Sequence, residues 1–561
     1  MFKLKKKRLF FLALIIFLLI NLGAIFFSWQ GRNVPLEPDD SGIYLTFIQA
    51  NKKYSSIFSR QVKVFDHPVM WDEYGGADKT TFFSWGFFWG KIAKLTSIEA
   101  ETAFKLSFYF GIIFFLLTLL YFFKEKGWQL KVILVLTFSF FTGDGIYHGF
   151  CWPVASFYAT TLYLLIVKII FQGEKNWFRK MIFISPIFFL THSLATVYLA
   201  GLVIYLPLSL YFLKSKDSKT RTRVLSLLIA GLTFYLFWFK FLIFKNVDLV
   251  KNTNIILSII SRLQSHEYLL YKKSALLIFD KYFLTILTRP LFLTLFILGL
   301  IETYKKEKKL LLLYISFFLL IMAGLFFPGG ERIMLIAWVL TFIIFSFGLN
   351  YLISLAAKIL KKQLSFKKQK KLIMLLLTNF FLEASFLAFI LKPNSSKNII
   401  LEKFFIYSKI IILAITLTTL LFNKKAILSK LILRWLFISL ASFFIYLFLE
   451  KAAMVVFLKN RNNYQFDKKI FLSEIETQKT GTIIYNDKIS FALFSGLGLI
   501  EKEAIKKDYL TTSYLNRASY FIASRAKFDH CQKQYCWLEM NNVKRKMELK
   551  AKDNNFLLYK F

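Results

Sequence analysis

Long apolar runs alternate along this chain with short polar and basic segments. A helix needs about 20 apolar residues to cross the roughly 30 Å of hydrocarbon in a bilayer, and most of the runs approach that length. The pattern therefore predicts an all-α polytopic membrane protein. We place about 13 transmembrane helices, at 9–29, 103–123, 130–142, 153–172, 181–191, 194–213, 224–244, 283–301, 310–327, 333–354, 372–391, 404–422 and 431–450.

Lys and Arg concentrate in every second connection between these runs. Basic residues mark the cytoplasmic side of a membrane protein, which assigns to that side KLKKKR, KEKGWQLK, GEKNWFRK, KSKDSKTRTR, ETYKKEKK, KILKKQLSFKKQKK and NKKAILSK. The opposite connections TGDGIYHGFCW, FPGGER and KPNSSKNIILEK are poorer in positive charge. This predicts a cytoplasmic N-terminus. The first run is expected to be an uncleaved anchor because it is long and no small-x-small site follows.

Three segments are expected outside the membrane, all on the non-cytoplasmic side. The first external loop, 30–102, contains TTFFSWGFFWGKIAKL, which is typical of an interfacial helix. The loop at 245–282 contains ISRLQSHEYLLYKK, a predicted amphipathic surface helix. In the tail, TGTIIYN, YFIASR, WLEM and NFLLYKF predict strands, and SFALFSGLGLIEKEAIKK is more helical. We therefore divide the chain into a membrane module at 1–450 and a small C-terminal extracytoplasmic α/β domain at 451–561.

Composition and charge exclude several classes of protein. With 57% hydrophobic residues and 68 Phe in 561 residues, the chain is too apolar for a soluble enzyme. The net charge of +41 does not indicate a nucleic-acid partner, because the basic residues are divided among many turns rather than forming one stripe. No G-x-x-x-x-G-K-[ST] or G-x-G-x-x-G element is present, so nothing points to nucleotide hydrolysis or a dinucleotide cofactor.

The segment PLEPDDSGIY, residues 35–44, places three acids shortly after the first span. A carboxylate near the hydrocarbon boundary costs free energy unless it is hydrated or paired, so such residues are functional candidates. The alternative is structural, because Glu37, Asp39 and Asp40 are also suitable caps for a helix that begins at SGIYLTFIQ. The residues by themselves leave both interpretations open.

The arrangement as a whole resembles the GT-C membrane glycosyltransferases, of the protein mannosyltransferase and aminoarabinose transferase type. It combines an anchor span, the acidic motif PDDSGIY at the start of the first external loop, many further spans and an external C-terminal domain. FFSWGFFWGKIAKLTSIEAETAFKLSFYFG resembles the return of the family's first loop, and FFLTHSLATVYLAGLVIYL resembles its paired helices around a His. The resemblance covers most of 1–350 in layout, through short motifs.

The chemistry that this resemblance implies suits several residues. An acceptor hydroxyl needs a general base, and this role would belong to Asp39 or Asp40, with Tyr44 of the same motif in contact with substrate. The departing phosphate needs positive charge or hydrogen-bond donors. We prefer Arg332 in FPGGERIM, with Glu331 beside it, because a guanidinium binds phosphate through two parallel hydrogen bonds. Alternatively, Arg332 pairs with Glu331 or reaches lipid headgroups.

Two further external segments carry candidate substrate ligands. Asp72 and Glu73 in MWDEYGG form a second acid pair and are the alternative catalytic candidates. Asp144 and His148 in TGDGIYHGF lie in the turn where the oligosaccharyltransferase branch carries a D-x-D metal motif. This sequence has no D-x-D there, so the resemblance implies a metal-independent enzyme with a lipid-linked monosaccharide donor. Asp144 remains a candidate for binding substrate.

A histidine and two cysteines complete the set of candidates. His192 is expected to form a hydrogen bond inside the helix bundle, with contact to substrate as the alternative. Cys531 and Cys536, five apart in HCQKQYC, form a candidate disulfide if the tail is extracytoplasmic. Two free thiols, or a metal site that includes His530, are the alternatives; no fourth ligand is evident for a metal.

The resemblance implies an inverting membrane glycosyltransferase that transfers a hexosyl or pentosyl group at the outer side of the plasma membrane. Its expected partners are a polyprenyl-phosphate-sugar donor, a protein, lipid or glycan acceptor, and the lipid bilayer, with no nucleic acid. No cofactor is expected, and a divalent metal remains open. Three other functions also remain open. They are a lipid-linked glycan polymerase or ligase, a transporter or flippase of lipid-linked saccharides, although the repeat-like halves of a transporter are not found, and a non-enzymatic membrane scaffold.

Overall fold

The structure is a computed structural model of the 561-residue chain. It describes residues 2–29, 83–142, 149–173, 176–192, 194–213, 217–242, 275–287, 290–325, 333–360, 447–456, 468–475, 482–486, 512–525, 534–540, 543–553 and 556–561, with short pieces at 44–45, 48–49, 51–52, 440–441, 444–445, 497 and 504–506.

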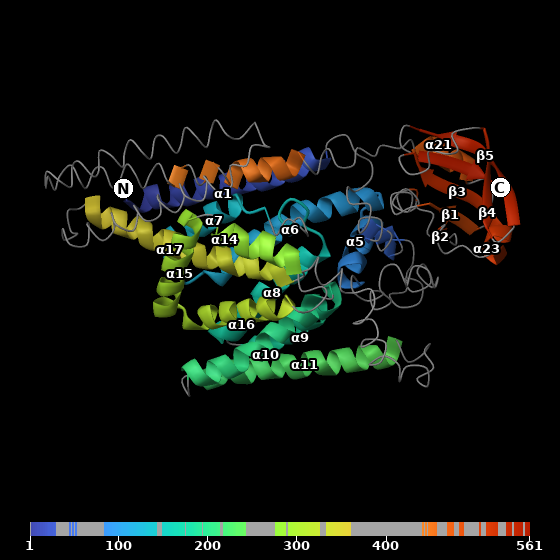
Figure 1. The fold of residues 1–561 in the computed structure, drawn as a ribbon. Coiled ribbons are helices and arrows are strands. Elements are labelled where there is room, and N and C mark those ends of the chain that lie inside the picture. The colour runs from blue at the N-terminus through green and yellow to red at the C-terminus, as the bar shows by residue number, and fades with distance from the viewer. Residues whose placement is uncertain are drawn as a thin grey trace.

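A bundle of helices makes up most of the described chain, and a small sheet lies beyond one end of it (Figure 1). The apolar runs of the sequence form these helices because a helix satisfies its backbone hydrogen bonds internally, as the hydrocarbon interior demands. The bundle contains α1 (Phe2–Trp29), α6 (Ala100–Phe122), α7 (Trp128–Ser139), α8 (Ala155–Gln172), α9 (Trp177–Thr191), α10 (Leu194–Leu213), α11 (Ser218–Leu242), α15 (Pro290–Lys306), α16 (Lys308–Gly324) and α17 (Met334–Leu360).

Five of the described helices are long and apolar enough to cross a membrane: Lys7–Ser28, Ala100–Phe122, Ala155–Gln172, Leu194–Leu213 and Met334–Lys358. The expected short runs are helices of 12 and 15 residues, α7 and α9. The spans expected at 372–391 and 404–422 lie outside the described residues. The total of about 13 spans therefore remains a prediction.

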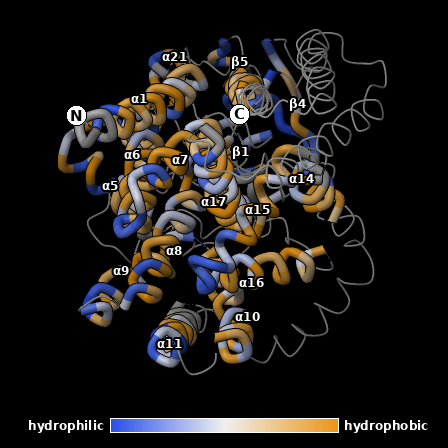
Figure 2. Tube along the Cα trace, turned by 90° about the vertical axis from the view of Figure 1, so that its left-hand side faces the viewer, coloured by the Kyte–Doolittle hydropathy of each residue, from blue (hydrophilic) through white to orange (hydrophobic). Residues whose placement is uncertain are grey.

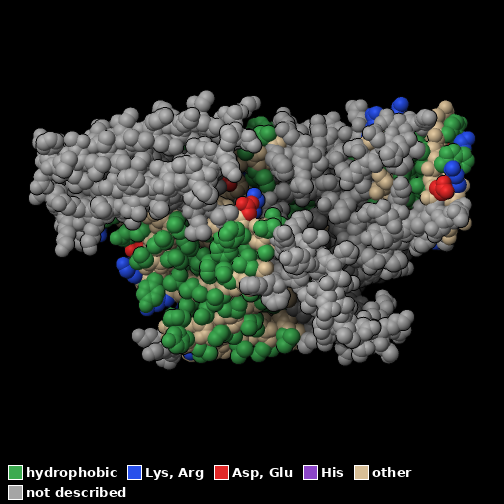
Figure 3. All heavy atoms as spheres, viewed as in Figure 1, with side chains coloured by type: hydrophobic (Ala, Val, Ile, Leu, Met, Phe, Trp, Pro, Cys, Tyr) green, Lys and Arg blue, Asp and Glu red, His purple; other side chains and the backbone are tan. Residues whose placement is uncertain are grey.

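The membrane helices differ in how deeply they lie in the bundle. In α8 and α17, 83% of the 18-residue apolar stretch of the helix is buried inside the protein, against 28% in α1. Large side chains of α1 instead face outward, with Leu19 70% exposed, and Figure 3 shows a mainly hydrophobic surface over the described helices. Protein packing therefore surrounds α8 and α17, and the outer face of α1 is suited to lipid.

Two glycines bring α15 and α17 into backbone contact. A Cβ atom on Gly299 would clash with the carbonyl of Ile344, and one on Gly348 would clash with the carbonyl of Leu295. Small residues at such crossings allow close van der Waals packing, which replaces the hydrophobic drive that is missing inside a membrane. The two helices are thereby fixed against each other near the middle of the bundle.

The first loop returns to the bundle through α5 (Phe83–Leu95), so the helix expected within TTFFSWGFFWGKIAKL is confirmed. Trp85 and Trp89 are buried, whereas Phe88 and Leu95 are exposed. This helix therefore has one aromatic face toward the protein and another apolar face outside it. The helix expected within ISRLQSHEYLLYKK lies outside the described residues; after it come a π-helix, η4 (Phe279–Leu284), and α14 (Thr285–Leu287).

The helix ends form two groups at opposite ends of the bundle. The basic end comprises the helix ends around Lys126, Gln172, Asp217 and Lys309, which line one common cavity. Figure 2 looks along the helices from this side and shows hydrophilic segments at the near ends of several of them. The loop end comprises the residues around Trp85, Phe141 and Trp152, and Figure 1 shows the sheet beyond the same end as α5.

The C-terminal region contains a mixed six-stranded sheet in the order β2-β1-β3-β6-β5-β4. The parallel pairs are β1 with β2 and β1 with β3, and the remaining pairs are antiparallel. The described helices of this region are α21 (Lys468–Ile475) and α23 (Thr512–Arg517). The strands are β1 (Thr482–Tyr485), β2 (Ala504–Lys506), β3 (Ala518–Ser524), β4 (Tyr535–Met540), β5 (Val543–Lys552) and β6 (Phe556–Lys560).

The four strands expected in this region are present, but two others were not foreseen. The end of SFALFSGLGLIEKEAIKK forms the edge strand β2 instead of a helix, because its backbone pairs with β1. Strand β5 was missed, although VKRKMELKAK alternates apolar and charged residues with the period of a half-buried strand. The last described bundle helix continues past Glu450 to Val456, so helical structure extends beyond the predicted boundary at 450.

Candidate functional site

Most of the candidate site residues lie outside the described part of the chain: Asp39, Asp40, Asp72, Glu73, Asp144, His148, Glu331, Arg332 and Cys531. Their roles therefore remain predictions. The structure does describe Tyr44, His192 and Cys536, together with the helix ends that flank the two most important loops. These flanking residues define the surroundings of the candidate site at the loop end.

Tyr44, which follows the acidic motif, is anchored in an aromatic cluster. It is 4% exposed, and its ring lies 5.3 Å from the Trp85 ring of α5 and 6.2 Å from the Phe104 ring of α6. The Trp85 and Phe104 rings are themselves in edge contact at 5.8 Å. Each such pair contributes roughly 0.5–1.5 kcal/mol beyond its buried area. Tyr44 is therefore packed between α5 and α6.

The same cluster continues to the second turn at the loop end. Phe104 contacts Phe108 at 5.0 Å, and Phe108 contacts Trp152 at 4.5 Å. Trp152 follows the turn 143–148, which carries Asp144 and His148. One continuous row of rings thus links the chain that follows the first acidic motif to the chain that follows the second candidate segment.

Close packing holds α5 in place beside this row. A Cβ on Gly90 would lie only 2.9 Å from the backbone carbon of Asn51, so a side chain there would displace the 48–52 segment. Lys52 also donates a hydrogen bond of 2.7 Å to the carbonyl of Ile98. The indole Nε1 of Trp85 is buried and has no hydrogen-bond partner among the residues that the structure describes. An unused donor of this kind is available to a polar group that enters the cluster.

Segment 143–148 lies outside the described residues, but the residues on either side of it contact each other. The N–H of Phe150 donates to the carbonyl of Thr142 at 3.2 Å and closes the turn at its base. The Phe150 ring packs against Phe115 of α6 at 4.7 Å and Phe17 of α1 at 6.2 Å. Cys151 is buried and free. The described residues just after the segment that carries Asp144 and His148 are therefore well packed.

Lys451 is a fully buried cation directly beside that turn. It is 2% exposed, and its Nζ donates to Asn21 Oδ1 at 2.5 Å, to the carbonyl of Ser139 at 2.9 Å and to that of Phe141 at 3.1 Å. The ammonium also lies 5.7 Å from the centre of the Phe150 ring. Three acceptors match its three N–H donors. The last bundle helix is thereby tied to α1, to the end of α7 and to the base of the turn.

Sequence reasoning missed Lys451 and its partner Asn21, although both leave a signal. Asn21 interrupts the apolar run of the first span, and Lys451 directly follows the last one. Polar residues in such positions are costly and usually have partners in the bundle. The pairing joins residues 430 apart in the chain, so only the folded structure identifies it.

His192 forms a hydrogen bond within the bundle at the end of α9. Its Nδ1 accepts the N–H of Leu194 at 3.1 Å, next to the beginning of α10, and the residue is 8% exposed. A neutral imidazole that accepts at Nδ1 carries its proton at Nε2. The histidine thus helps to order the sharp turn between α9 and α10.

Cys536 on β4 is bonded in a disulfide, and Cys531 lies outside the described residues. The pairing of these two cysteines therefore stays a prediction. Among the described residues, no group of three or more His, Cys, Asp or Glu side chains is arranged to hold a metal ion.

Comparison with solved structures finds chains that share the general course of this one. The chain is similar to ArnT from Cupriavidus metallidurans in the apo state, with a TM-score of 0.49, 11% identity and 97% of each chain covered. It is also similar to the archaeal oligosaccharyltransferase AglB from Archaeoglobus fulgidus in complex with an inhibitory peptide and a dolichol-phosphate, with a TM-score of 0.43, 9% identity, and 98% of this chain and 75% of that chain covered.

Both similarities have TM-scores below 0.5 and identities of 11% or less, and neither assigns a family to this chain. No residue role follows from similarity at this level. No protein-family model matches the sequence, and no curated protein matches it.

Proposed function

We propose that this chain is an inverting membrane glycosyltransferase of the GT-C type. It would transfer a hexosyl or pentosyl group from a polyprenyl-phosphate-linked donor to a protein, lipid or glycan acceptor at the loop end of the bundle. That end would face the outside of the plasma membrane, with the N-terminus in the cytoplasm, because the basic end carries the Lys-rich turns.

One observation carries the proposal. Tyr44, four residues after Asp40, and Trp152, four residues after His148, belong to one row of contacting rings. The described residues that follow these two polar segments, Tyr44 and Trp152, therefore share one packed base. A site that aligns an acceptor with a lipid-linked donor requires such a base, because small displacements of the reacting groups cost large factors in rate.

Residues of the neighbouring loops would carry out the chemistry. Asp39 or Asp40 would accept the proton of the acceptor hydroxyl as its oxygen attacks the anomeric carbon. The bond between that carbon and the phosphate oxygen breaks, and Arg332 would stabilise the departing phosphate. Asp144 and His148 would bind the sugar from the second turn. None of these steps requires a nucleotide.

The test is transfer of radiolabelled sugar from a panel of polyprenyl-phosphate sugars to membrane extracts that contain the full chain. We expect Asp39→Asn or Asp40→Asn to lower transfer by about 10²–10⁴-fold, the usual contribution of a general base. Asp78→Asn, in the same loop, is the charge-matched control and should retain activity. All variants are compared at equal amounts of folded protein.

Other outcomes would favour other functions. Full activity in both Asp variants, with loss in Asp72→Asn or Glu73→Gln, would move the base to the second acid pair. Consumption of no donor in the panel would contradict glycosyl transfer and favour a transporter or a glycan ligase.

A further inference from the structure

A cavity of about 550 Å³ opens at the basic end of the bundle, between the ends of α6, α8, α15 and α16. It is far from the loop end, since α6 and α8 separate the two along their length. Its lining contains the lysines Lys126, Lys168, Lys305, Lys306, Lys308 and Lys309.

The lining carries a clear excess of positive charge. Three acids accompany the six lysines: Glu125, Asp217 and Glu307. Two of these acids are already engaged, because Glu307 forms an ion pair with Lys126 and Asp217 forms one with Lys309. The lining itself has a formal net charge of +3. Lys306 is paired with Glu302, which lies outside the lining, so an excess of +2 remains to attract an anionic occupant.

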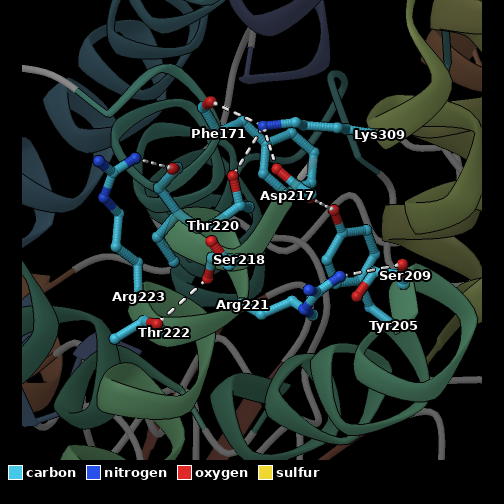
Figure 4. Close-up of polar contacts among 11 residues, drawn as sticks. Phe171, Tyr205, Ser209, Asp217, Ser218, Thr220, Arg221, Thr222, Arg223 and Lys309 are labelled. Carbon is cyan, nitrogen blue, oxygen red and sulfur yellow. Dashed lines mark hydrogen bonds and ion pairs between the residues drawn. The ribbon is translucent and has the colours of Figure 1, made fainter. Parts of the chain in front are cut away.

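The ion pair between Lys309 and Asp217 belongs to the framework of the cavity. Figure 4 shows Lys309 pointing toward Asp217, Thr220 and the carbonyl of Phe171. Its Nζ lies 2.5 Å from Asp217 Oδ1 and donates to Thr220 Oγ1 at 2.7 Å, and Tyr205 donates to Asp217 Oδ2 at 3.3 Å. These contacts tie the first turn of α16 to the start of α11.

The remaining cations are arranged at the rim and at the back. Lys305 and Lys308 are exposed, and neither forms an ion pair with any residue that the structure describes. Lys168 is 1% exposed and lies inside the apolar helix α8, where its Nζ donates to the carbonyl of Phe122 at 2.7 Å. A buried ammonium in a membrane helix is costly and marks a functional position.

Apart from the polar Gln172, the other residues of the lining are apolar and continue onto the membrane helices. They are Phe122, Phe123, Phe171, Leu213 and Leu310. The cavity therefore combines a cationic rim with an apolar wall at the level where membrane-spanning helices end. Basic pockets between helices at this level suit the headgroups of anionic lipids.

We propose that this cavity binds the phosphate headgroup of an anionic phospholipid from the leaflet at the basic end. Lys305 and Lys308 hold the phosphate oxygens at the rim, and Lys168 adds positive charge from the back. The first carbons of the acyl chains follow the apolar wall toward the bilayer. A free phosphate shares the headgroup chemistry but gains nothing from that wall.

Binding can be measured on the purified full chain in nanodiscs of phosphatidylcholine, with a fluorescent short-chain phosphatidylglycerol as the probe. The Lys305→Ala/Lys308→Ala variant should weaken binding about tenfold or more, since a lysine near a lipid headgroup contributes roughly a fivefold factor in affinity. Lys219→Ala/Lys358→Ala removes two exposed lysines outside the cavity lining and should leave binding unchanged. Lys168→Gln, which removes the cation at the back of the cavity, should also weaken binding of the probe.

Three results would overturn the proposal. Equal losses in the two double variants would mean that surface charge alone attracts the probe. Equal affinity for phosphatidylcholine would remove the role of the anionic headgroup. Displacement of the probe by millimolar inorganic phosphate, as efficient as displacement by unlabelled phosphatidylglycerol, would assign the cavity to a free anion. Because the readout is binding, it does not depend on transfer activity.

Discussion

The two ends of the helical bundle are held together by different interactions. At the loop end, rings from α5, α6 and the turn before α8 contact one another in a row, and Lys451 is the single buried cation described there. At the basic end, ion pairs and bonds from lysines to carbonyls join the helices. The loop end is therefore packed mainly through uncharged rings. The basic end is joined through charged side chains.

The difference follows from the solvent that each end meets. Contacts between uncharged rings do not depend on the pairing of charges. A lysine cluster attracts anions and is favoured where lipid headgroups are anionic. The contrast predicts that charge removal acts most strongly on stability where an ion pair is buried and least where it is exposed.

The largest effect is expected for Lys309→Met at the basic end. This change leaves the carboxylate of Asp217, whose side chain is 4% exposed, buried without its cation. Lys309 is itself 36% exposed, so the expected loss of unfolding free energy lies in the lower part of the range of about 3–5 kcal/mol for breaking a fully buried pair. The thermal midpoint of the detergent-solubilised protein should fall clearly. The double variant Lys309→Met/Asp217→Asn should recover most of the loss, and failure to recover would show that Lys309 acts through packing alone.

A somewhat smaller effect is expected for Lys451→Met at the loop end. The variant removes a charge but leaves Asn21 Oδ1 and two backbone carbonyls without their donor. Each unsatisfied buried group costs about 1–3 kcal/mol, and relaxation reduces the sum to about 3 kcal/mol. In a double-mutant cycle with Asn21→Leu, a coupling energy of about 1 kcal/mol or more should appear. Independent, additive effects would contradict the tie between the last helix and α1.

The smallest effect is expected for Lys126→Gln at the rim of the basic end. Its partner Glu307 is 26% exposed and Lys126 itself 34%, so solvent and salt screen their ion pair. Removing such a pair costs about 0–1 kcal/mol, and less in high salt. Unfolding titrations at low and high ionic strength check this. A loss as large as that of Lys309→Met would contradict the expected difference between the ion pair of the buried Asp217 and that of the more exposed Glu307.

The sequence was a good guide to the fold wherever a segment's own pattern decides its structure. The apolar runs predicted α6 and α10 closely, because 20 or so apolar residues have no stable alternative to a helix in hydrocarbon. The short apolar runs YFIASR and NFLLYKF predicted β3 and β6, and the aromatic segment of the first loop predicted α5. The grouping of basic turns at one end also followed from the pattern, since alternate loops of a bundle lie on one side.

Only the tertiary structure decided which distant residues meet. Nothing local to Asn21 or Lys451 specifies their contact, and nothing local to Lys168 places it in a cavity with Lys305 and Lys308. The edge strand β2 shows the same limit, because its pairing with β1 overrides a helical pattern. The periodicity of a segment indicates only which of its faces is apolar. A buried cation is stable only where folding brings acceptors from several helices to within hydrogen-bond distance.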